Sequence, residues 1–191
     1  MTLTDDRTVS RGQNQKFTTK DMAMIGLMTA ITCVLAPMAI PIGPVPISLT
    51  NLVLYFSLYL VGTKFTLVSY VIYLLLGLVG LPVFSGFTGG PAKLAGPTGG
   101  YLIGFLLMIW IAGIFITRSN GKKWIDLSGM IIGTAAVYAV GTVWLSVQSG
   151  MDFRAALFAG VIPFLPGDAV KIFLALFQGR KIRSLLLRIR K

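Results

Sequence analysis

The chain has 191 residues, of which 55% are hydrophobic and 12% charged, and its mean hydropathy is +0.82. This composition excludes a soluble globular domain and indicates a single polytopic membrane domain. Histidine and glutamate are absent from the sequence and Cys33 is its only cysteine. Disulfides, zinc or iron clusters, Cys–His nucleophiles and histidine-based proton transfer are therefore excluded. The net charge of +11 does not indicate a nucleic-acid partner, because the basic residues flank apolar stretches, where they set membrane orientation.

Residues 1–20 are polar and contain no apolar segment, which predicts a short cytoplasmic tail. Thr18, followed three residues later by Asp21, resembles a capping box. It precedes an apolar helix that we expect from about 22 to 36. Pro37 should end this helix because proline has no backbone N–H to continue the hydrogen bonding.

Gly26 and Ala30 lie in this first helix with the small-xxx-small spacing that lets a second helix approach closely. The helix that packs there belongs either to the same chain or to a partner protein, and the spacing by itself favours neither.

The next segment, residues 37–46, contains too many prolines for a helix and is predicted to be an extended loop buried against the protein. Two apolar stretches follow at 47–61 and 65–81, separated by Gly62-Thr63-Lys64. Each is shorter than the roughly 20 residues of a full membrane span. One long kinked helix is therefore an alternative to two separate helices.

Residues 82–100 are rich in glycine and proline, which predicts irregular backbone. At membrane depth such backbone is stable only where it is buried in protein or lines a cavity. The segment lacks the Gly-Lys-Ser/Thr of a phosphate-binding loop. Beyond it we expect spanning helices at 101–117 and 127–147 and a shorter apolar helix at 155–162.

The distribution of lysine and arginine decides the number of spans. With six spans, fourteen of the seventeen basic residues fall on one side of the membrane, and only Lys93, Arg154 and Lys171 remain on the other. Basic residues stay in the cytoplasm, so both termini are predicted to be cytoplasmic. Five spans would place one strongly basic end outside.

The predicted fold class is accordingly an all-α membrane protein with six transmembrane helices, cytoplasmic termini and irregular Gly/Pro-rich extracytoplasmic loops. The transmembrane domain is expected at 21–180, between the tail at 1–20 and a basic cytoplasmic tail at 181–191.

The last helix is expected from Pro166 to about Gln178, since proline suits the first helical turn. Asp168 and Lys171 then share one face at i,i+3 spacing. They form either an ion pair within the helix or part of a substrate pocket. Ionisable groups inside a membrane are costly, and they usually face a polar cavity or a partner.

Three segments should meet at the extracytoplasmic end, namely 37–46, 82–100 and the turn at Asp168, and together they predict a pocket for a small amphipathic anion. Lys171 and Lys93 are candidates to neutralise a carboxylate, and Asp168 to accept from an N–H group. Polar candidates for the rest of a planar head group are Asn51 and Thr50. Apolar walls are expected from Phe84, Phe87, Tyr55 and Tyr101.

Four segments carry a family resemblance: Pro46-Ile47-Ser48-Leu49-Thr50-Asn51, Gly80-Leu81-Pro82-Val83-Phe84, Gly96-Pro97-Thr98-Gly99-Gly100-Tyr101 and Pro166-Gly167-Asp168-Ala169-Val170-Lys171. In this order and spacing they resemble BioY, the family of biotin-specific substrate-binding subunits of energy-coupling factor transporters. The resemblance extends over nearly the whole chain from about residue 20.

The resemblance implies biotin as the transported ligand and no cofactor. It implies partners in the membrane, namely a transmembrane coupling subunit and two ATPase subunits. It places Asp168 and Lys171 in contact with biotin and docks the coupling subunit on Gly26 and Ala30. Polar contacts from the middle loops vary within the family, and here the candidates are Thr50, Asn51, Ser85 and Lys93. The loops would close over biotin, and the subunit would reorient in the membrane as the ATPases cycle.

Three other functions are possible from the sequence. A membrane-embedded enzyme would use Asp168 and Lys171 chemically, but an activated nucleophile and a metal cluster are missing. A channel or secondary carrier would need no ATPase, and no pair of broken helices supports it. A substrate-binding subunit for another small carboxylate vitamin is the third.

Overall fold

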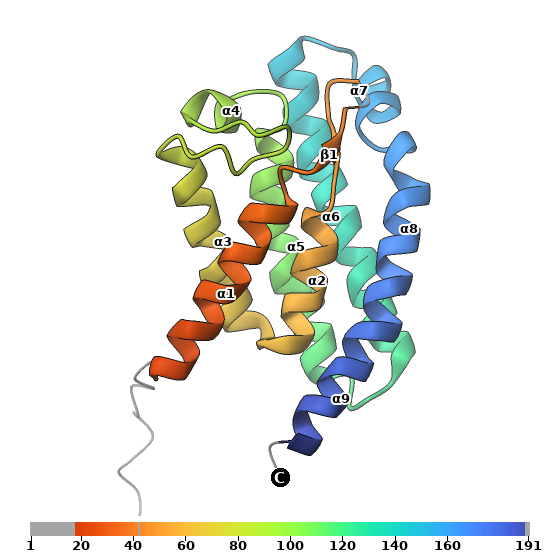
Figure 1. Ribbon diagram of the computed structural model, residues 1–191. Coiled ribbons are helices and arrows are strands. Elements are labelled where there is room, and N and C mark those ends of the chain that lie inside the picture. Colours follow the sequence, from red (N-terminus) through yellow and green to blue (C-terminus); the bar gives the residue numbers. More distant parts are fainter. Residues whose placement is uncertain (1–17, 42, 190–191) are drawn as a thin grey trace, which may run out of the picture.

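A computed structural model describes residues 18–41 and 43–189. Most of the predicted N-terminal tail and the end of the C-terminal tail lie outside these ranges, as does Ile42 in the proline-rich segment. The described chain is a bundle of helices that run roughly side by side, with one very small sheet at one end (Figure 1).

The first helix, α1 (Thr19–Leu35), begins at the capping box that the sequence predicts. The Thr18 hydroxyl accepts a hydrogen bond from the backbone N–H of Asp21 at 3.2 Å, and the Asp21 carboxylate accepts one from the backbone N–H of Thr18 at 3.0 Å. Both bonds satisfy donors that a helix start would leave unpaired.

The proline-rich segment after α1 is extended, as predicted, and forms a narrow antiparallel ribbon. Its predicted burial is largely wrong, because Met38 and Ile40 are 55% and 63% exposed, although Val45 is buried. Strand β1 (Ala39–Ile40) pairs with β2 (Ile47–Ser48), with Ala39 opposite Ser48. The ribbon lies across one end of the bundle (Figure 1).

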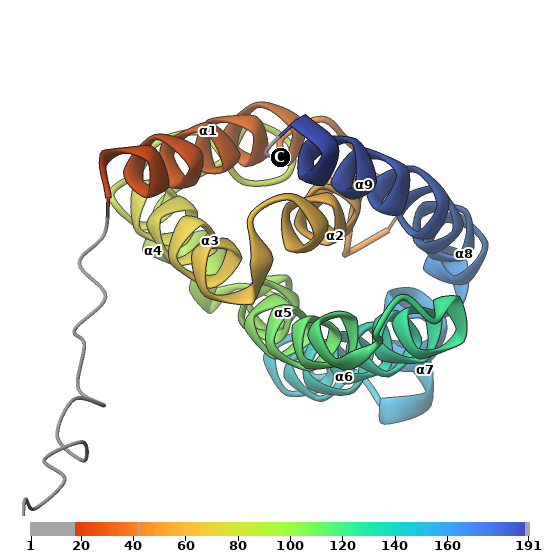
Figure 2. The ribbon, with the colours of Figure 1, turned by 90° about the horizontal axis from the view of Figure 1, so that it is seen from below.

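Two separate helices follow, α2 (Thr50–Leu60) and α3 (Gly62–Leu78), so the alternative of one long kinked helix is wrong. Gly62 has a φ of +81°, a conformation that glycine adopts without the steric cost of a Cβ, and the chain reverses there. Helix α2 lies inside the ring formed by the other long helices (Figure 2), and eight of its eleven residues are buried.

The glycine-rich segment is irregular, as predicted, apart from the five-residue helix α4 (Pro91–Ala95). It leads into the pair α5 (Gly99–Arg118) and α6 (Lys123–Ser149). These two helices approach closely through glycines. A Cβ on Gly104 would lie 3.1 Å from the Val137 Cα, and one on Gly133 would lie 3.1 Å from the Met108 side chain.

The last part of the chain is α7 (Phe153–Gly160), the 3₁₀ turn η1 (Ile162–Phe164) and α8 (Leu165–Leu174). Helix α8 continues through one π-helical turn, η2 (Ala175–Gly179), into α9 (Arg180–Ile189). The expected end near Gln178 is therefore wrong. Gly179 does not stop the helix; it makes room for Tyr59, whose ring a Cβ at this position would overlap.

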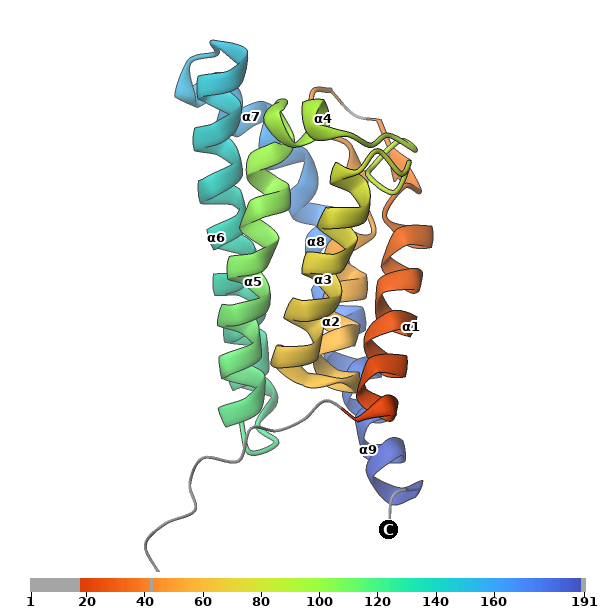
Figure 3. The same ribbon diagram turned by 90° about the vertical axis from the view of Figure 1, so that its left-hand side faces the viewer.

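Within residues 18–41 and 43–189, three helical stretches are long and apolar enough to cross a membrane: α5, α6 and Phe153–Leu185. Figures 1 and 3 show two different ends of the bundle. The loop end carries the ribbon, α4 and α7. The basic end carries the start of α1, the α2–α3 junction, the α5–α6 loop and α9.

Candidate functional site

A cavity at the loop end lies between α2, α5, α6 and α8, under the β1–β2 ribbon, and contains about 60 Å³ of free space. Its lining combines charged, polar and aromatic side chains, among them Asn51, Thr98, Tyr101, Tyr138, Asp168 and Lys171. Charged groups at such a place within an apolar bundle indicate a binding site.

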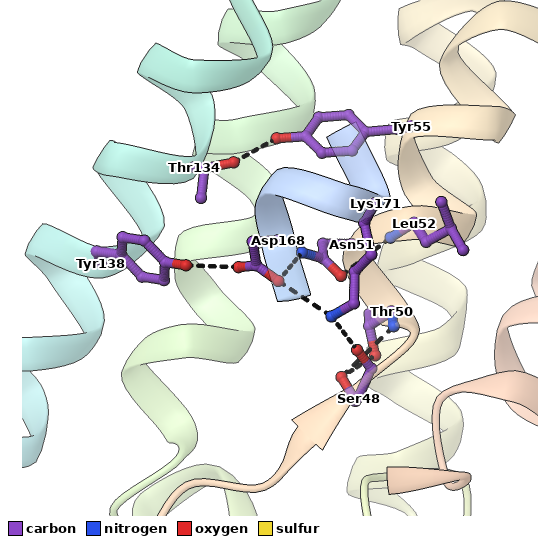
Figure 4. A network of polar contacts seen from close by, with 9 residues as sticks. All are labelled: Ser48, Thr50, Asn51, Leu52, Tyr55, Thr134, Tyr138, Asp168 and Lys171. Carbon is purple, nitrogen blue, oxygen red and sulfur yellow. Dashed lines mark hydrogen bonds and ion pairs between the residues drawn. The ribbon is translucent and has the colours of Figure 1, made fainter. Parts of the chain in front are cut away.

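Asp168 is the centre of the polar contacts in this cavity (Figure 4). It lies in the first turn of α8 and is 8% exposed. Its Oδ1 atom accepts from Asn51 Nδ2 at 2.8 Å and from Lys171 Nζ at 3.0 Å, and its Oδ2 atom accepts from the Tyr138 hydroxyl at 2.6 Å. Donors from α2, α6 and α8 thus compensate the cost of burying this carboxylate.

Lys171 is equally buried and connects α8 to the ribbon. Besides the ion pair with Asp168, its Nζ donates to the backbone carbonyl of Ser48 at 2.7 Å. Ser48 is the last residue of β2, so the ribbon is attached to the same helix that carries the ion pair.

Local sequence explains why the pair points into the cavity. Pro166 lies in the first turn of α8, where its missing N–H costs nothing. Asp168 then lies near the positive end of the helix, which stabilises a carboxylate. The i,i+3 spacing brings Lys171 onto the same face.

Of the other predicted site residues, Asn51, Thr50, Ser85 and Tyr101 line this cavity. The Thr50 hydroxyl lies 2.9 Å from that of Ser48. The Tyr101 hydroxyl donates to the Gly160 carbonyl at 3.0 Å, so Tyr101 presents its ring to the cavity and fixes the end of α7.

Four predicted residues are not among those lining the cavity. Phe84 is fully buried against Gly77, and its ring packs edge-on to Tyr73, which does line the cavity, at 5.5 Å. Lys93 lies in α4, Phe87 is 67% exposed, and the Tyr55 hydroxyl donates to the Met130 carbonyl at 2.9 Å.

Sequence reasoning missed five residues with polar groups that line the cavity: Ser48, Tyr73, Thr98, Thr134 and Tyr138. Thr134 and Tyr138 are spaced i,i+4 in the long apolar helix α6, so they share a face. The i,i+4 spacing of these two hydroxyl groups in an apolar helix was the sequence pattern that could have revealed them. The Ser48 contact comes from a backbone carbonyl, which leaves no mark in a sequence.

Gly26 and Ala30 lie on the outside of α1. Both are exposed, and a Cβ added to Gly26 would meet nothing within 4 Å. Within the described residues, their small-residue face is therefore not used for packing the bundle.

Apolar helices around a buried ion pair define an all-helical membrane protein, and comparison with solved structures identifies its fold as that of an S-component. A crystal structure described as the S-component for biotin from an ECF-type ABC transporter matches with a TM-score of 0.80 and 34% identity, covering 92% of this chain and 95% of that one. The BioY family model matches residues 11–188, and the chain belongs to the BioY family.

Relatives agree over almost their full length. The biotin transporter BioY of Thermotoga maritima is 35% identical over 166 residues, which are 87% of this chain and 97% of that protein. The biotin transporter BioY2 of Lactococcus lactis is 36% identical over 165 residues, or 86% and 91% of the two chains.

Proposed function

We propose that the loop-end cavity binds biotin and that the chain is the biotin-specific S-component of an ECF-type ABC transporter. The buried ion pair in a member of the BioY family is the observation that carries this proposal. Each partner keeps hydrogen-bonding capacity for a ligand: Asp168 uses three of about four acceptor positions, and Lys171 uses two of three donors.

Both charged groups serve the ureido ring of biotin in this proposal. Lys171 Nζ and Asp168 Oδ1 are 3.0 Å apart, a separation that suits a neighbouring C=O and N–H of one ureido group. A ligand carboxylate on Lys171 would instead lie close to the carboxylate of Asp168, and like charges repel. The geometry therefore favours the ureido carbonyl over the ligand carboxylate as the partner of Lys171, which changes the role expected from the sequence.

The valerate carboxylate then points toward hydroxyl donors. Thr98 lines the cavity, is 7% exposed, and its hydroxyl has no hydrogen-bond partner among the described residues. Ser85 lines the same cavity from the glycine-rich segment. Both hydroxyls can donate to a carboxylate.

Entry of biotin requires the loop end to open. The free space of about 60 Å³ is well below the roughly 300–1,000 Å³ of typical small-molecule sites. Val45 and Pro46 of the proline-rich segment and Ser85 of the glycine-rich segment line the cavity, so these two segments are the parts proposed to separate for entry and to close afterwards.

The basic end faces the cytoplasm in this proposal, with six spans and both termini inside. The start of α1, the α2–α3 junction, the α5–α6 loop and α9 all lie at that end (Figure 3), and basic loops remain cytoplasmic. Helix α2 is only about 16 Å long by its residue count. Its position inside the bundle shields it from lipid.

Uptake is driven by partners rather than by catalysis in this chain. The small-residue face at Gly26 and Ala30 docks a transmembrane coupling subunit, which connects to two ATPase subunits. Its exposure and lack of packing partners within the described bundle support this assignment. ATP-driven cycling then reorients the subunit to release biotin inside.

Calorimetry with biotin and with its carboxyl-blocked amide tests the site. If Lys171 holds the ureido ring, Lys171→Met should weaken both ligands by a similar factor, about a hundredfold. The ratio between the two ligands should stay as in the wild type. If the variant instead erases a wild-type preference for biotin over the amide, Lys171 holds the carboxylate. Unchanged binding of both ligands would reject the site.

Co-purification with the coupling and ATPase subunits tests docking. Ala30→Leu should reduce recovery of the complex while leaving biotin affinity within about twofold. Ala135→Leu is the matched control, since Ala135 is also exposed but lies on α6. Equal loss in both variants would reject the α1 face as the docking surface.

A further inference from the structure

A second cavity lies at the basic end of the bundle, on the opposite side from the biotin site. The end of α2, the α5–α6 loop, the start of α6 and the start of α9 surround it, and its polar lining includes Tyr59, Asn120, Asp126, Arg180 and Arg183. The site proposed for biotin uses none of these residues.

A buried ion pair forms one wall of this cavity. Asp126 is 1% exposed, and its Oδ2 atom lies 3.2 Å from Arg180 Nη1. The Tyr59 hydroxyl donates to the same oxygen at 3.0 Å. Arg180 also donates through Nη2 to the backbone carbonyl of Gly121 in the α5–α6 loop.

Two buried polar atoms in this wall are not satisfied by the protein. Among the described residues, Asp126 Oδ1 has no hydrogen-bond partner, and Arg180 Nη1 has no bond of hydrogen-bonding geometry in addition to its ion pair. Buried polar groups are normally paired. The cavity therefore presents one acceptor and one cationic donor next to each other.

The surroundings make the cavity positive. Arg183 lines it with an exposed side chain, and the same end of the bundle carries Arg118, Lys122, Lys123 and Lys181. Of the described residues that line it, Asp126 is the only acidic one. A ligand with a negative group near the arginines and a donor near Asp126 would complete the site.

The residues beside the cavity are of the kinds found where a membrane meets water. Trp124, two residues before Asp126, is 79% exposed, and Lys123 Nζ lies 5.1 Å from the centre of the Phe177 ring. Exposed tryptophan beside basic residues is typical of the interface between lipid and water.

We propose that this cavity binds the headgroup of a phospholipid. The phosphate pairs with Arg183 and Arg180, and a hydroxyl or ammonium group of the same headgroup donates to Asp126 Oδ1. Arginine suits phosphate because its planar donors bind two oxygens together. Basic pockets between helices on the cytoplasmic side are suited to lipid headgroups. The assignment rests on the proposed orientation of the chain but not on its ligand.

Native mass spectrometry of the detergent-purified full chain tests the proposal. Dioleoyl phosphatidylglycerol has both phosphate and hydroxyl donors, whereas dioleoyl phosphatidylcholine has the phosphate but lacks a donor. Phosphatidylglycerol should bind at least about fivefold more tightly. Arg183→Gln should weaken the binding of phosphatidylglycerol at least about fivefold, because it removes a partner of the phosphate. Lys181→Gln should change this binding less than about twofold, since Lys181 is exposed and does not line the cavity.

Equal binding of the two lipids, or equal losses in the two variants, would overturn the proposal in favour of a general surface charge effect. Displacement of phosphatidylglycerol by an equimolar amount of glycerol 3-phosphate would overturn it in favour of a soluble phosphate ligand. Biotin calorimetry on the same samples separates this result from the proposed function, because neither variant touches the loop-end cavity.

Discussion

Each end of the bundle contains a polar cluster. Both clusters take their residues from the same three parts of the chain: α2, α6 and the continuous helix formed by α8, η2 and α9. The loop-end cluster comprises Asn51 of α2, Tyr138 of α6, and Asp168 and Lys171 of α8. The basic-end cluster comprises Tyr59 of α2, Asp126 of α6, and Arg180 of α9. Each of these three helical segments thus contributes polar side chains to both clusters.

The clusters differ in where the charges lie. At the loop end both charges are on one helix, and the neighbouring helices contribute only neutral groups. A ligand can replace those neutral contacts without leaving either charge unpaired. At the basic end the charges lie on different helices, so separating the helices would leave a buried charge uncompensated, which is strongly unfavourable. The loop-end arrangement is suited to exchanging its neutral contacts for a ligand. The basic-end arrangement is suited to holding helices together, and the headgroup proposed there would add contacts without replacing the ion pair.

The π turn η2 lies between the two clusters and affects how they align. In an unbroken α-helix, Asp168 and Arg180 would face directions about 120° apart, at about 100° per residue over twelve residues. A π turn contains one additional residue, which reduces this difference to about 20°. Both side chains therefore point into the bundle from one continuous helix.

The largest change in biotin affinity, as large as that expected from Lys171→Met, is expected from Asp168→Asn. The substitution keeps the size of the side chain but removes the charge that three donors and the ligand share, and hydrogen bonds to charged groups contribute about 1.5–3 kcal/mol each. We expect the Kd for biotin to rise about a hundredfold, as measured by calorimetry. Asp152→Asn is the control, since Asp152 is an exposed N-cap of α7 and asparagine caps equally well.

A similar Kd in the two variants would contradict the assignment of the loop-end cluster as the ligand site. A melting curve on each sample shows whether Asp168→Asn remains folded. If it does not, the Lys171→Met titration still tests the same cluster.

Sequence reasoning found the elements that depend on local chemistry. The capping box at Thr18, the extended proline-rich segment and the irregular glycine-rich segment follow from the properties of a few neighbouring residues. Asp168 and Lys171 stand out because charges are rare in an apolar chain, and their i,i+3 spacing is itself local.

The features that sequence reasoning missed depend on contacts between segments that are far apart in the sequence. A tyrosine within the 27-residue helix α6 does not indicate by itself that its hydroxyl meets a carboxylate thirty residues further on. Gly179 followed by basic residues resembles a helix end. Only the position of Tyr59, on another helix, explains why glycine is needed there. The π turn likewise has no signature in the sequence.

A smaller change in biotin affinity is expected from Tyr138→Phe. It removes the 2.6 Å bond to Asp168 Oδ2 but keeps the ring and both charges. The loss of one hydrogen bond to a charged group corresponds to about a tenfold rise in Kd. Tyr55→Phe is the matched control, because its hydroxyl contacts Thr134 and the Met130 carbonyl rather than Asp168. We expect less than a threefold change there, and an equal effect of both variants in fluorescence titration would show that Tyr138 acts only through packing.

The smallest change in affinity, and the largest in stability, is expected when the basic-end pair is broken. Asp126→Asn leaves Arg180 partly buried without its countercharge, which should cost about 3 kcal/mol of the free energy of unfolding. The double variant Asp126→Asn with Arg180→Gln should lose less than the two single variants added together, because both charges are then removed. Thermal melting in detergent measures the loss, and calorimetry should find the Kd for biotin within about twofold of the wild type. If the Kd instead rises together with the loss of stability, the two clusters are energetically coupled through their shared helices. Biotin binding at the loop end would then depend on the ion pair between helices at the basic end.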